Sequence, residues 1–335
     1  MAAPAAEVAA LFQQPPLVTA QPARAPLMAV ARAGQRLVAV GVHGTIALSD
    51  DNGASWRSAS VPADVTLTTV RFADARVGWA AGHLGAVLRT EDGGEHWSVQ
   101  LDGLALARVA VAQAMGEDRQ RLAARLAQDG PDKPWLDLLV ESDQRVTLSG
   151  AFNLALQSVD GGRNWRWISD RFVNPSGFHL YGLARGGAAA LAVGEQGTVL
   201  TSADGVRFTP VKSPYDGSFF GVAGLGEQRF LMFGMRGNAF VTADAGATWT
   251  RAEVAGNTAS FNAAAVLSGG VVALGDQAGR VYLSGDGGHN FVAAPYAGAP
   301  VTGMVEAADG TLVLTSFAGI ARIPGKVIKS VMKGG

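Results

Sequence analysis

Short apolar runs separated by polar turns fill most of this chain, and within the runs hydrophobic and polar residues tend to alternate. Between residues 66 and 100 the runs read TLTTVRF, VGWAAG, AVLRT and WSVQ. β-Branched and aromatic residues are frequent in them, and turn-forming residues bound each one, which is typical of β-strands joined by tight turns. The pattern predicts about four short strands in each stretch of roughly 40 residues, the arrangement of a β-propeller blade.

An octapeptide of the form Ser/Thr-x-Asp-x-Gly-x-x-aromatic marks these units. SDDNGASW, TEDGGEHW, SVDGGRNW, TADAGATW and SGDGGHNF begin at residues 49, 90, 158, 242 and 284, and a worn copy, TSADGVRF, begins at 201. The closing aromatics are spaced by 41, 68, 43, 41 and 42 residues, so the second interval holds an insertion of about 27 residues.

The octapeptide suits a structural turn between the third and fourth strands. Its hydroxyl and carboxylate can accept backbone N–H groups, its glycines supply positive φ, and its aromatic ring covers the sheet. Carboxylates scattered around one rim cannot converge on one substrate, which argues against catalysis or calcium binding. The residues assigned to this structural role are Asp51, Trp56, Asp92, Trp97, Asp160, Trp165, Asp204, Phe208, Asp244, Trp249, Asp286 and Phe291.

A second repeated turn fixes the number of units. GVHG, GHLG, GAFN, GEQG, GMRG, GDQAG and SFAG, beginning at residues 41, 82, 150, 194, 234, 275 and 316, each fit between a second and a third strand. We expect an all-β chain: one seven-bladed β-propeller over residues 27–326, with four-stranded antiparallel blades. Residues 1–26 are expected to add the strand that closes the last blade, around PPLVT, which removes a sheet edge. Residues 327–335 form a tail.

Residues 106–130 are the one passage expected to be helical, inserted before the third blade. Leu122, Ala123 and Leu126 form an apolar stripe, and Arg119, Arg121 and Arg125 lie mainly off it. Gly116 divides or ends a first piece, and the run from Asp129 to Pro131 stops the helix. The insertion is either a docking lever for a partner or an inert lid on the rim.

Composition excludes several classes of protein. The 27 basic and 28 acidic side chains nearly balance, so no bulk field draws in nucleic acid or an anionic membrane. The chain has no cysteine, and no apolar run is long enough to insert into a membrane. The start, MAAPAAEVAA, does not have the pattern of a signal peptide. It resembles the segment that remains after signal-peptide cleavage, preceded by an added Met.

The octapeptides are similar to Asp-boxes, or BNR repeats, of sialidases, xyloglucan-cleaving hydrolases and sortilin-type receptors. Residues 70–97, VRFADARVGWAAGHLGAVLRTEDGGEHW, resemble more closely the repeat of the photosystem II stability/assembly factor-like propellers. That resemblance implies a non-enzymatic propeller without cofactor, on the lumenal or periplasmic side of a membrane, which assists a membrane protein complex. The helical insertion and the lack of a dense arginine patch depart from the photosynthetic pattern. They favour the bacterial branch associated with exporters of the resistance-nodulation-division (RND) type, in the periplasm.

Strand order puts the glycine turns and the links between blades on the face opposite the octapeptides, and a partner site is expected there. The turns contribute His43, His83, Phe152, Glu195, Gln196, Arg236, Asp276 and Phe317. The starts of the innermost strands contribute an aromatic collar of Trp135, Phe178, Tyr181, Phe219, Phe220 and Phe261. The collar either contacts a partner or plugs gaps between blades, and neighbours such as Phe219 and Phe220 should face opposite sides.

Enzymatic alternatives are weaker. A sialidase needs three arginines around a Tyr/Glu pair and an acid, and only Tyr181 and Tyr215 are expected to be reachable. ARIP at residues 321–324 follows the last octapeptide instead of preceding the first, so it is not the sialidase element. A glycoside hydrolase could pair Glu195 with Asp276, so a carbohydrate-binding or carbohydrate-cleaving propeller remains the alternative. His43 and His83 lack a third ligand for a metal.

Overall fold

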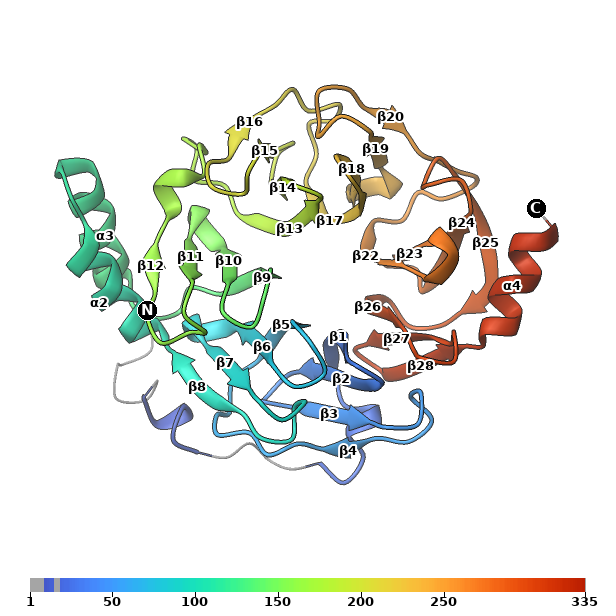
Figure 1. Cartoon of the computed structure of the whole chain (residues 1–335), viewed down its shortest axis with the longest axis horizontal. Coiled ribbons are helices and arrows are strands. Elements are labelled where there is room, and N and C mark those ends of the chain that lie inside the picture. Colours follow the sequence, from blue (N-terminus) through green and yellow to red (C-terminus); the bar gives the residue numbers. More distant parts are fainter. Residues whose placement is uncertain (1–8, 15–18, 335) are drawn as a thin grey trace. The chain divides into compact units, whose positions relative to one another are not determined.

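The computed structural model describes residues 9–14 and 19–334, which form seven β-sheets (Figure 1). The fold is a seven-bladed β-propeller built mainly of four-stranded antiparallel blades, as the repeat predicts. The chain divides into two compact units. Unit 1 comprises Met1–Asp50 and Ser55–Ser169, and unit 2 comprises Asp51–Ala54 and Asp170–Gly335.

Unit 1 holds three sheets, each with its four strands side by side in chain order. The strands are β1 (Leu27–Ala33), β2 (Arg36–Gly41), β3 (Ile46–Ser49), β4 (Arg57–Ser58), β5 (Leu67–Phe72), β6 (Gly78–Gly82), β7 (Val87–Thr90), β8 (Ser98–Leu101), β9 (Trp135–Val140), β10 (Val146–Gly150), β11 (Ala155–Ser158) and β12 (Arg166–Trp167). The first strands β1, β5 and β9 contact one another in turn. Buried Val, Leu and Trp side chains fill the space between successive sheets.

Unit 2 holds the other four sheets, which follow the same chain order with one exception. Their strands are β13 (Leu180–Gly186), β14 (Ala189–Gly194), β15 (Val199–Ser202), β16 (Thr209–Pro210), β17 (Phe219–Gly226), β18 (Arg229–Gly234), β19 (Ala239–Thr242), β20 (Thr250–Arg251), β21 (Glu253–Val254), β22 (Phe261–Val266), β23 (Val272–Asp276), β24 (Arg280–Ser284), β25 (Asn290–Ala297), β26 (Val301–Glu306), β27 (Leu312–Ser316) and β28 (Gly319–Ile323). The exception is the five-stranded sheet, in which β21 pairs in parallel with β25. This fifth strand was not predicted.

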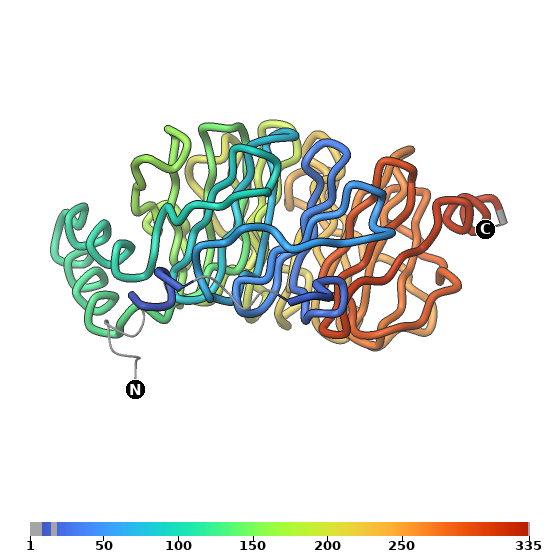
Figure 2. Tube along the Cα trace, turned by 90° about the horizontal axis from the view of Figure 1, so that it is seen from below, coloured from blue at the N-terminus to red at the C-terminus, as the bar shows by residue number. Residues whose placement is uncertain are grey.

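Strand direction separates two kinds of turn within each sheet that has a fourth strand after its third. Because neighbouring strands are antiparallel, the second-to-third turn and the third-to-fourth turn lie at opposite ends, which we call the glycine-turn end and the octapeptide end (Figure 2). The linkers into the first strands lie at the glycine-turn end: His83 N–H donates to Thr66 O, and Met235 N–H donates to Ser218 O. Among the described residues, the predicted separation of the two turns is thus present in the six sheets that have a third-to-fourth turn; the sheet β26–β28 has only the second-to-third turn.

Linkers also tie adjacent sheets together at the octapeptide. In unit 1, Ser60 bridges in parallel to His96, and Ser60 O accepts the Trp97 N–H. In unit 2, Phe172 bridges to Phe208 in the same way, and the two rings stack with centroids 4.3 Å apart. The residue that closes an octapeptide therefore also contacts the linker that comes from the preceding sheet.

The insertion between β8 and β9 forms two α-helices, α2 (Gly103–Gln113) and α3 (Glu117–Asp129). Asp102 caps α2 by accepting the Ala105 N–H, and Gly116 and Gly130, both with positive φ, flank α3. The sequence placed this helical passage and its stop correctly. It missed α4 (Gly325–Gly334), so the insertion is not the one helical passage, and residues 327–334 are not a plain tail.

Short 3₁₀ turns complete the structure. They are η1 (Pro22–Arg24), η2 (His83–Gly85), η3 (Ala151–Asn153), η4 (Ser169–Arg171), η5 (Met235–Gly237) and η6 (Ser268–Gly270). The predicted closing strand around PPLVT falls mainly on residues 15–18, which lie outside the described residues. Within the described part, the last sheet has three strands, β26–β28. The nearby η1 contacts β3 and β4 of the first sheet, and Ser58 donates to Thr19 O.

Candidate partner-binding site

The octapeptides form closed turns, and their aspartates are occupied by their own backbone. In the second copy, Thr90 Oγ1 donates to Asp92 and accepts the Gly94 N–H at 2.9 Å, while Asp92 accepts the His96 N–H at 3.0 Å. Trp97 folds back so that its Nε1 donates to Gly94 O. These contacts support the structural role assigned to the octapeptides.

The same hydrogen bonds perturb the carboxyl groups. The Asn164 side-chain amide and backbone N–H hold the pKa of Asp160 at about 2. The Thr248 hydroxyl and backbone N–H do the same for Asp244, whose pKa is also about 2. Such carboxylates stay ionised and bonded, so they are poor candidates for proton transfer.

At the glycine-turn end of unit 2, the turn between β14 and β15 carries Glu195 back over the linker into β13. Glu195 Oε2 accepts the His179 backbone N–H at 2.8 Å and lies 2.8 Å from His179 Nδ1. Tyr181 donates its phenol to Glu195 Oε1 at 3.5 Å. Leu180, between His179 and Tyr181, points the other way and is fully buried, as strand alternation requires. Glu195 thus organises a histidine and a tyrosine on one side of the strand.

Aromatic rings extend this group toward the next sheet. Phe220, the second residue of β17, packs edge-on against Tyr181 with ring centroids 5.8 Å apart. Asn174 brackets Phe178 by donating to its carbonyl at 2.8 Å and accepting its N–H. Burial and the neighbouring Glu195 carboxylate raise the pKa of Tyr181, so its phenol stays protonated and remains a donor. We call Phe178, His179, Tyr181, Glu195 and Phe220 the aromatic–carboxylate cluster; all five are half-buried.

Three of the predicted collar residues do not reach the surface. Trp135, Phe219 and Phe261 have 0% exposure. Trp135 donates its indole N–H to Gly85 O, Phe219 packs edge-on against Phe240, and Phe261 against Tyr282. These three side chains fill space between neighbouring sheets, which was the alternative role given for the collar. The prediction that they contact a partner is wrong. Phe219 and Phe220 divide between the two sides as the alternation predicts.

Asp276 also departs from its predicted place on the surface. Its side chain is fully buried, accepts the backbone N–H groups of Ala278 and Arg280 at 2.9 and 2.8 Å, and pairs with Arg280 Nε at 3.2 Å. The Tyr282 phenol donates to it at 3.3 Å. It closes its own turn and is not free to act with Glu195 as a second catalytic carboxylate.

The remaining predicted turn residues are exposed, and each is described within its own unit. In unit 1, Phe152 is 60% exposed, Lys133 Nζ lies 5.9 Å from its ring, and His43 Nδ1 lies 3.0 Å from Asp64. His83 is exposed as well. In unit 2, Phe317 is 56% exposed, and Gln196 and Arg236 are exposed with positive φ.

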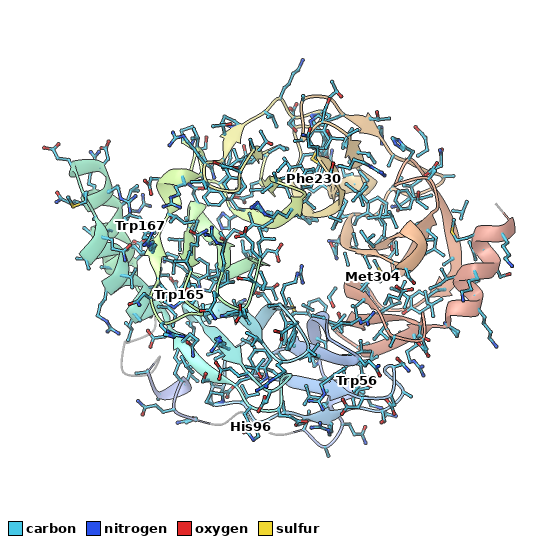
Figure 3. All side chains as sticks on the ribbon, viewed as in Figure 1. Trp56, His96, Trp165, Trp167, Phe230 and Met304 are labelled. Atoms are coloured by element: carbon cyan, nitrogen blue, oxygen red, sulfur yellow. The ribbon has the colours of Figure 1, made fainter. Side chains whose placement is uncertain are left out.

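The helical insertion packs against the edge strand of the third sheet (Figure 3). Arg119 lies 4.6 Å from the Trp167 ring and donates to the Trp167 carbonyl, and Gln113 bonds both Trp165 O and Trp167 N–H. Ala123 and Leu126 are buried as predicted, but Leu122 is exposed, which corrects the predicted stripe. Arg121 and Arg125 are exposed and pair with Asp118 and Asp129 on the same helix.

A cavity of about 540 Å³ opens at the octapeptide end of unit 2, away from the aromatic–carboxylate cluster. Glycine and alanine residues form most of its wall, including Gly186, Ala203 and Ala245. The described residues contain no group of three or more His, Asp or Glu side chains that could hold a metal ion. No helix within residues 9–14 and 19–334 is long and apolar enough to cross a bilayer.

His179 forms part of the cluster but was not predicted as a site residue, although its position between Phe178 and Tyr181 in GFHLYG was a signal. Exposed Met115, in the short connection between α2 and α3, was not predicted either.

Comparison with known proteins identifies the fold. No family model matches the sequence, and no curated protein matches it either. Among solved structures, YCF48 bound to D1 peptide is similar over 92% of this chain and 96% of its own, with a TM-score of 0.64 and 18% identity. YCF48 from Cyanidioschyzon merolae is similar over 93% of this chain and 100% of its own, with a TM-score of 0.68 and 14% identity.

The WD40 β-propeller domain of Doa1 is similar over 92% of this chain and 95% of its own, with a TM-score of 0.60 and 11% identity. At such identities the likeness concerns the fold alone.

Proposed function

We propose that this protein is a non-enzymatic propeller that binds a segment of a membrane protein complex and assists its assembly or operation. The observation that carries the proposal is the aromatic–carboxylate cluster, in which an anchored carboxylate, a tyrosine donor and two phenylalanine rings are presented half-buried at one end of unit 2. Aromatic residues that are partly covered and rigidly held are typical of protein interfaces.

The solved neighbours support a binding role. One of them, YCF48, is described as bound to a D1 peptide, so a propeller of this fold can hold a peptide segment. In the aromatic–carboxylate cluster, Glu195 and Tyr181 would pair with polar groups of such a segment, and Phe178 and Phe220 would pack on its apolar side chains. The octapeptide aspartates take no part, because their oxygens are bonded within their turns.

We further propose a periplasmic location and an RND-type exporter as the complex served. Both proposals rest on the resemblance of the Asp-box repeat to the assembly-factor propellers and on the helical insertion that departs from the photosynthetic pattern. They specify the setting of the binding function, which can stand without them.

The test is co-purification from detergent-solubilised membranes of the native host. Wild-type protein is expected to retain an inner-membrane exporter subunit, and Y181A/F220A to lose it at least about tenfold, the typical consequence of removing an interface anchor. V206A, which truncates an exposed apolar residue at the octapeptide end, is the control and should retain the subunit. Equal recovery with all three proteins would contradict the proposed site.

A carbohydrate-binding or carbohydrate-cleaving propeller is the second candidate, because a tyrosine beside a carboxylate is also found in sugar sites. Hydrolysis through Glu195 and Asp276 is disfavoured by the complete burial of Asp276. Glycan binding or hydrolysis that E195Q abolishes, in a protein that retains no membrane subunit, would favour this candidate instead.

A further inference from the structure

The C-terminal helix separates apolar and basic side chains onto opposite faces. Val327, Ile328, Val331 and Met332 pack on the hydrophobic core beneath α4. Lys326, Lys329 and Lys333 are all exposed. At 100° per residue, these three lysines fall within one narrow sector of the helix surface, opposite the apolar residues.

The sheet holds this helix firmly against its outer side. α4 contacts β24 and β25, and Ile328 is only 6% exposed (Figure 1). A Cβ at Gly285 would lie 2.8 Å from the Met332 methyl, and a Cβ at Gly325 would lie 2.7 Å from Gly310 O, so the helix lies close to the chain at both contacts. The apolar face is therefore occupied, and the lysine face is what the helix presents to its surroundings.

Charge is distributed unevenly along the chain. Residues 310–335 contain four basic side chains, Arg322 and the three lysines, and no acidic one, whereas the rest of the chain contains 23 basic and 28 acidic side chains. Three of the five lysines of the protein lie on α4. The overall balance of charge thus conceals a basic face on a chain that is otherwise acidic.

We propose that the lysine face of α4 docks on an anionic lipid bilayer surface. Protein interfaces are depleted in lysine and rely on aromatic residues, Met and Arg, but the α4 face presents ammonium groups while its Met and branched side chains are turned to the sheet. Single-stranded nucleic acid sites interleave basic and aromatic residues, and residues 324–333 contain no aromatic residue. Compact, hydrated ammonium groups on flexible stems suit a fluid layer of phosphate headgroups.

This contact is electrostatic and superficial, and it does not depend on the proposed partner. Each lysine near an anionic surface strengthens binding about fivefold, and the attraction falls off within a Debye length of about 10 Å at 0.1 M salt. The bilayer is not entered, because the apolar side of the helix is already buried against the sheet. The effect is to hold unit 2 by its outer side at a membrane surface.

Vesicle sedimentation of the full chain tests the proposal. Wild-type protein should sediment with vesicles of equal parts phosphatidylcholine and phosphatidylglycerol at low ionic strength, stay in solution with phosphatidylcholine alone, and be released by about 0.5 M salt. K326Q/K329Q/K333Q should bind on the order of a hundredfold more weakly. R108Q/R121Q/R125Q removes the same charge from α2 and α3 and should bind as wild type.

Three results would overturn the proposal. These are equal binding to both vesicle types, an equal loss in the two triple variants, and no binding to anionic vesicles at all, which would leave the lysine face to an acidic protein partner or to none. Circular dichroism and thermal unfolding of each variant separate lost binding from lost folding. Recovery of a membrane subunit in detergent, where no bilayer is present, tests the proposed function separately.

Discussion

Two turns of unit 2 carry similar side chains in similar positions but differ in how far those side chains are buried. At the turn between β14 and β15, Glu195 meets Tyr181, Phe220 and His179. At the turn between β23 and β24, Asp276 meets Tyr282, Phe261 and Arg280. Each region has a carboxylate after the glycine of its turn, and each has a tyrosine–phenylalanine pair in edge-on contact, at 5.8 and 5.9 Å.

The two regions differ in where the carboxylate is directed. Asp276 is short, and its turn is one residue longer, so its oxygens accept N–H groups of that same turn and become buried. Glu195 is longer by one methylene and reaches across to the linker before β13, where it stays half-exposed beside half-exposed rings. The same residue types therefore form a buried structural contact in one region and a candidate binding surface in the other.

Truncation of the phenylalanines should separate the two regions most strongly. F261A empties a fully buried position and is expected to lower the free energy of unfolding by about 3–5 kcal/mol, whereas F220A removes a half-buried ring and should cost less than half as much. Urea denaturation followed by tryptophan fluorescence measures both. Similar losses for the two variants would mean that both rings are structural.

The second largest difference is expected between the two carboxylates, in their contribution to the free energy of unfolding. D276N leaves backbone N–H donors poorly matched inside the protein and removes the charge partner of the half-exposed Arg280, with an expected loss of about 2–3 kcal/mol. E195Q should cost less than about 1 kcal/mol, because its contacts are partly solvated. Calorimetric unfolding compares them, and E195Q is expected to reduce recovery of the membrane subunit while folding is kept. A larger stability loss for E195Q than for D276N would reverse the assignment.

The octapeptides give the smallest expected effect. Their carboxylates are exposed or half-exposed, as Glu195 is, but have a structural role. The pKa of Asp244 is about 2 in the folded protein and near 3.8 when unfolded, so its stabilising contribution is present above about pH 4 and lost as the pH falls toward 2. Wild-type protein should therefore lose stability over that interval more steeply than D244N. Parallel pH profiles for the two proteins would show that the turn does not depend on the ionised carboxylate.

The repeat in the sequence was sufficient to predict the sheets, the positions of both kinds of turn and the helical insertion, because period-two alternation and turn residues are local signals. The same alternation separated Phe219 from Phe220. It could not show that Trp135 and Phe261 are buried, since their cover comes from residues distant in the chain, such as Gly85 for the Trp135 indole.

The directions in which the Glu195 and Asp276 carboxylates point could not be predicted from the sequence either. Glu195 and Asp276 occupy equivalent turns in the sequence pattern, and only the structure distinguishes them. α4 was not predicted although its apolar residues recur at helical spacing, since residues 327–335 are expected from the sequence to form only a tail.

Photo-crosslinking from position 220 shows whether the aromatic–carboxylate cluster contacts a membrane protein. A benzophenone amino acid replaces Phe220 in one protein and Val206, at the octapeptide end of unit 2, in another, and both are irradiated in cells of the native host. The proposed function predicts a crosslink to a membrane protein subunit from position 220 and none from position 206. Crosslinks of equal strength from both positions, or from position 206 alone, would contradict it.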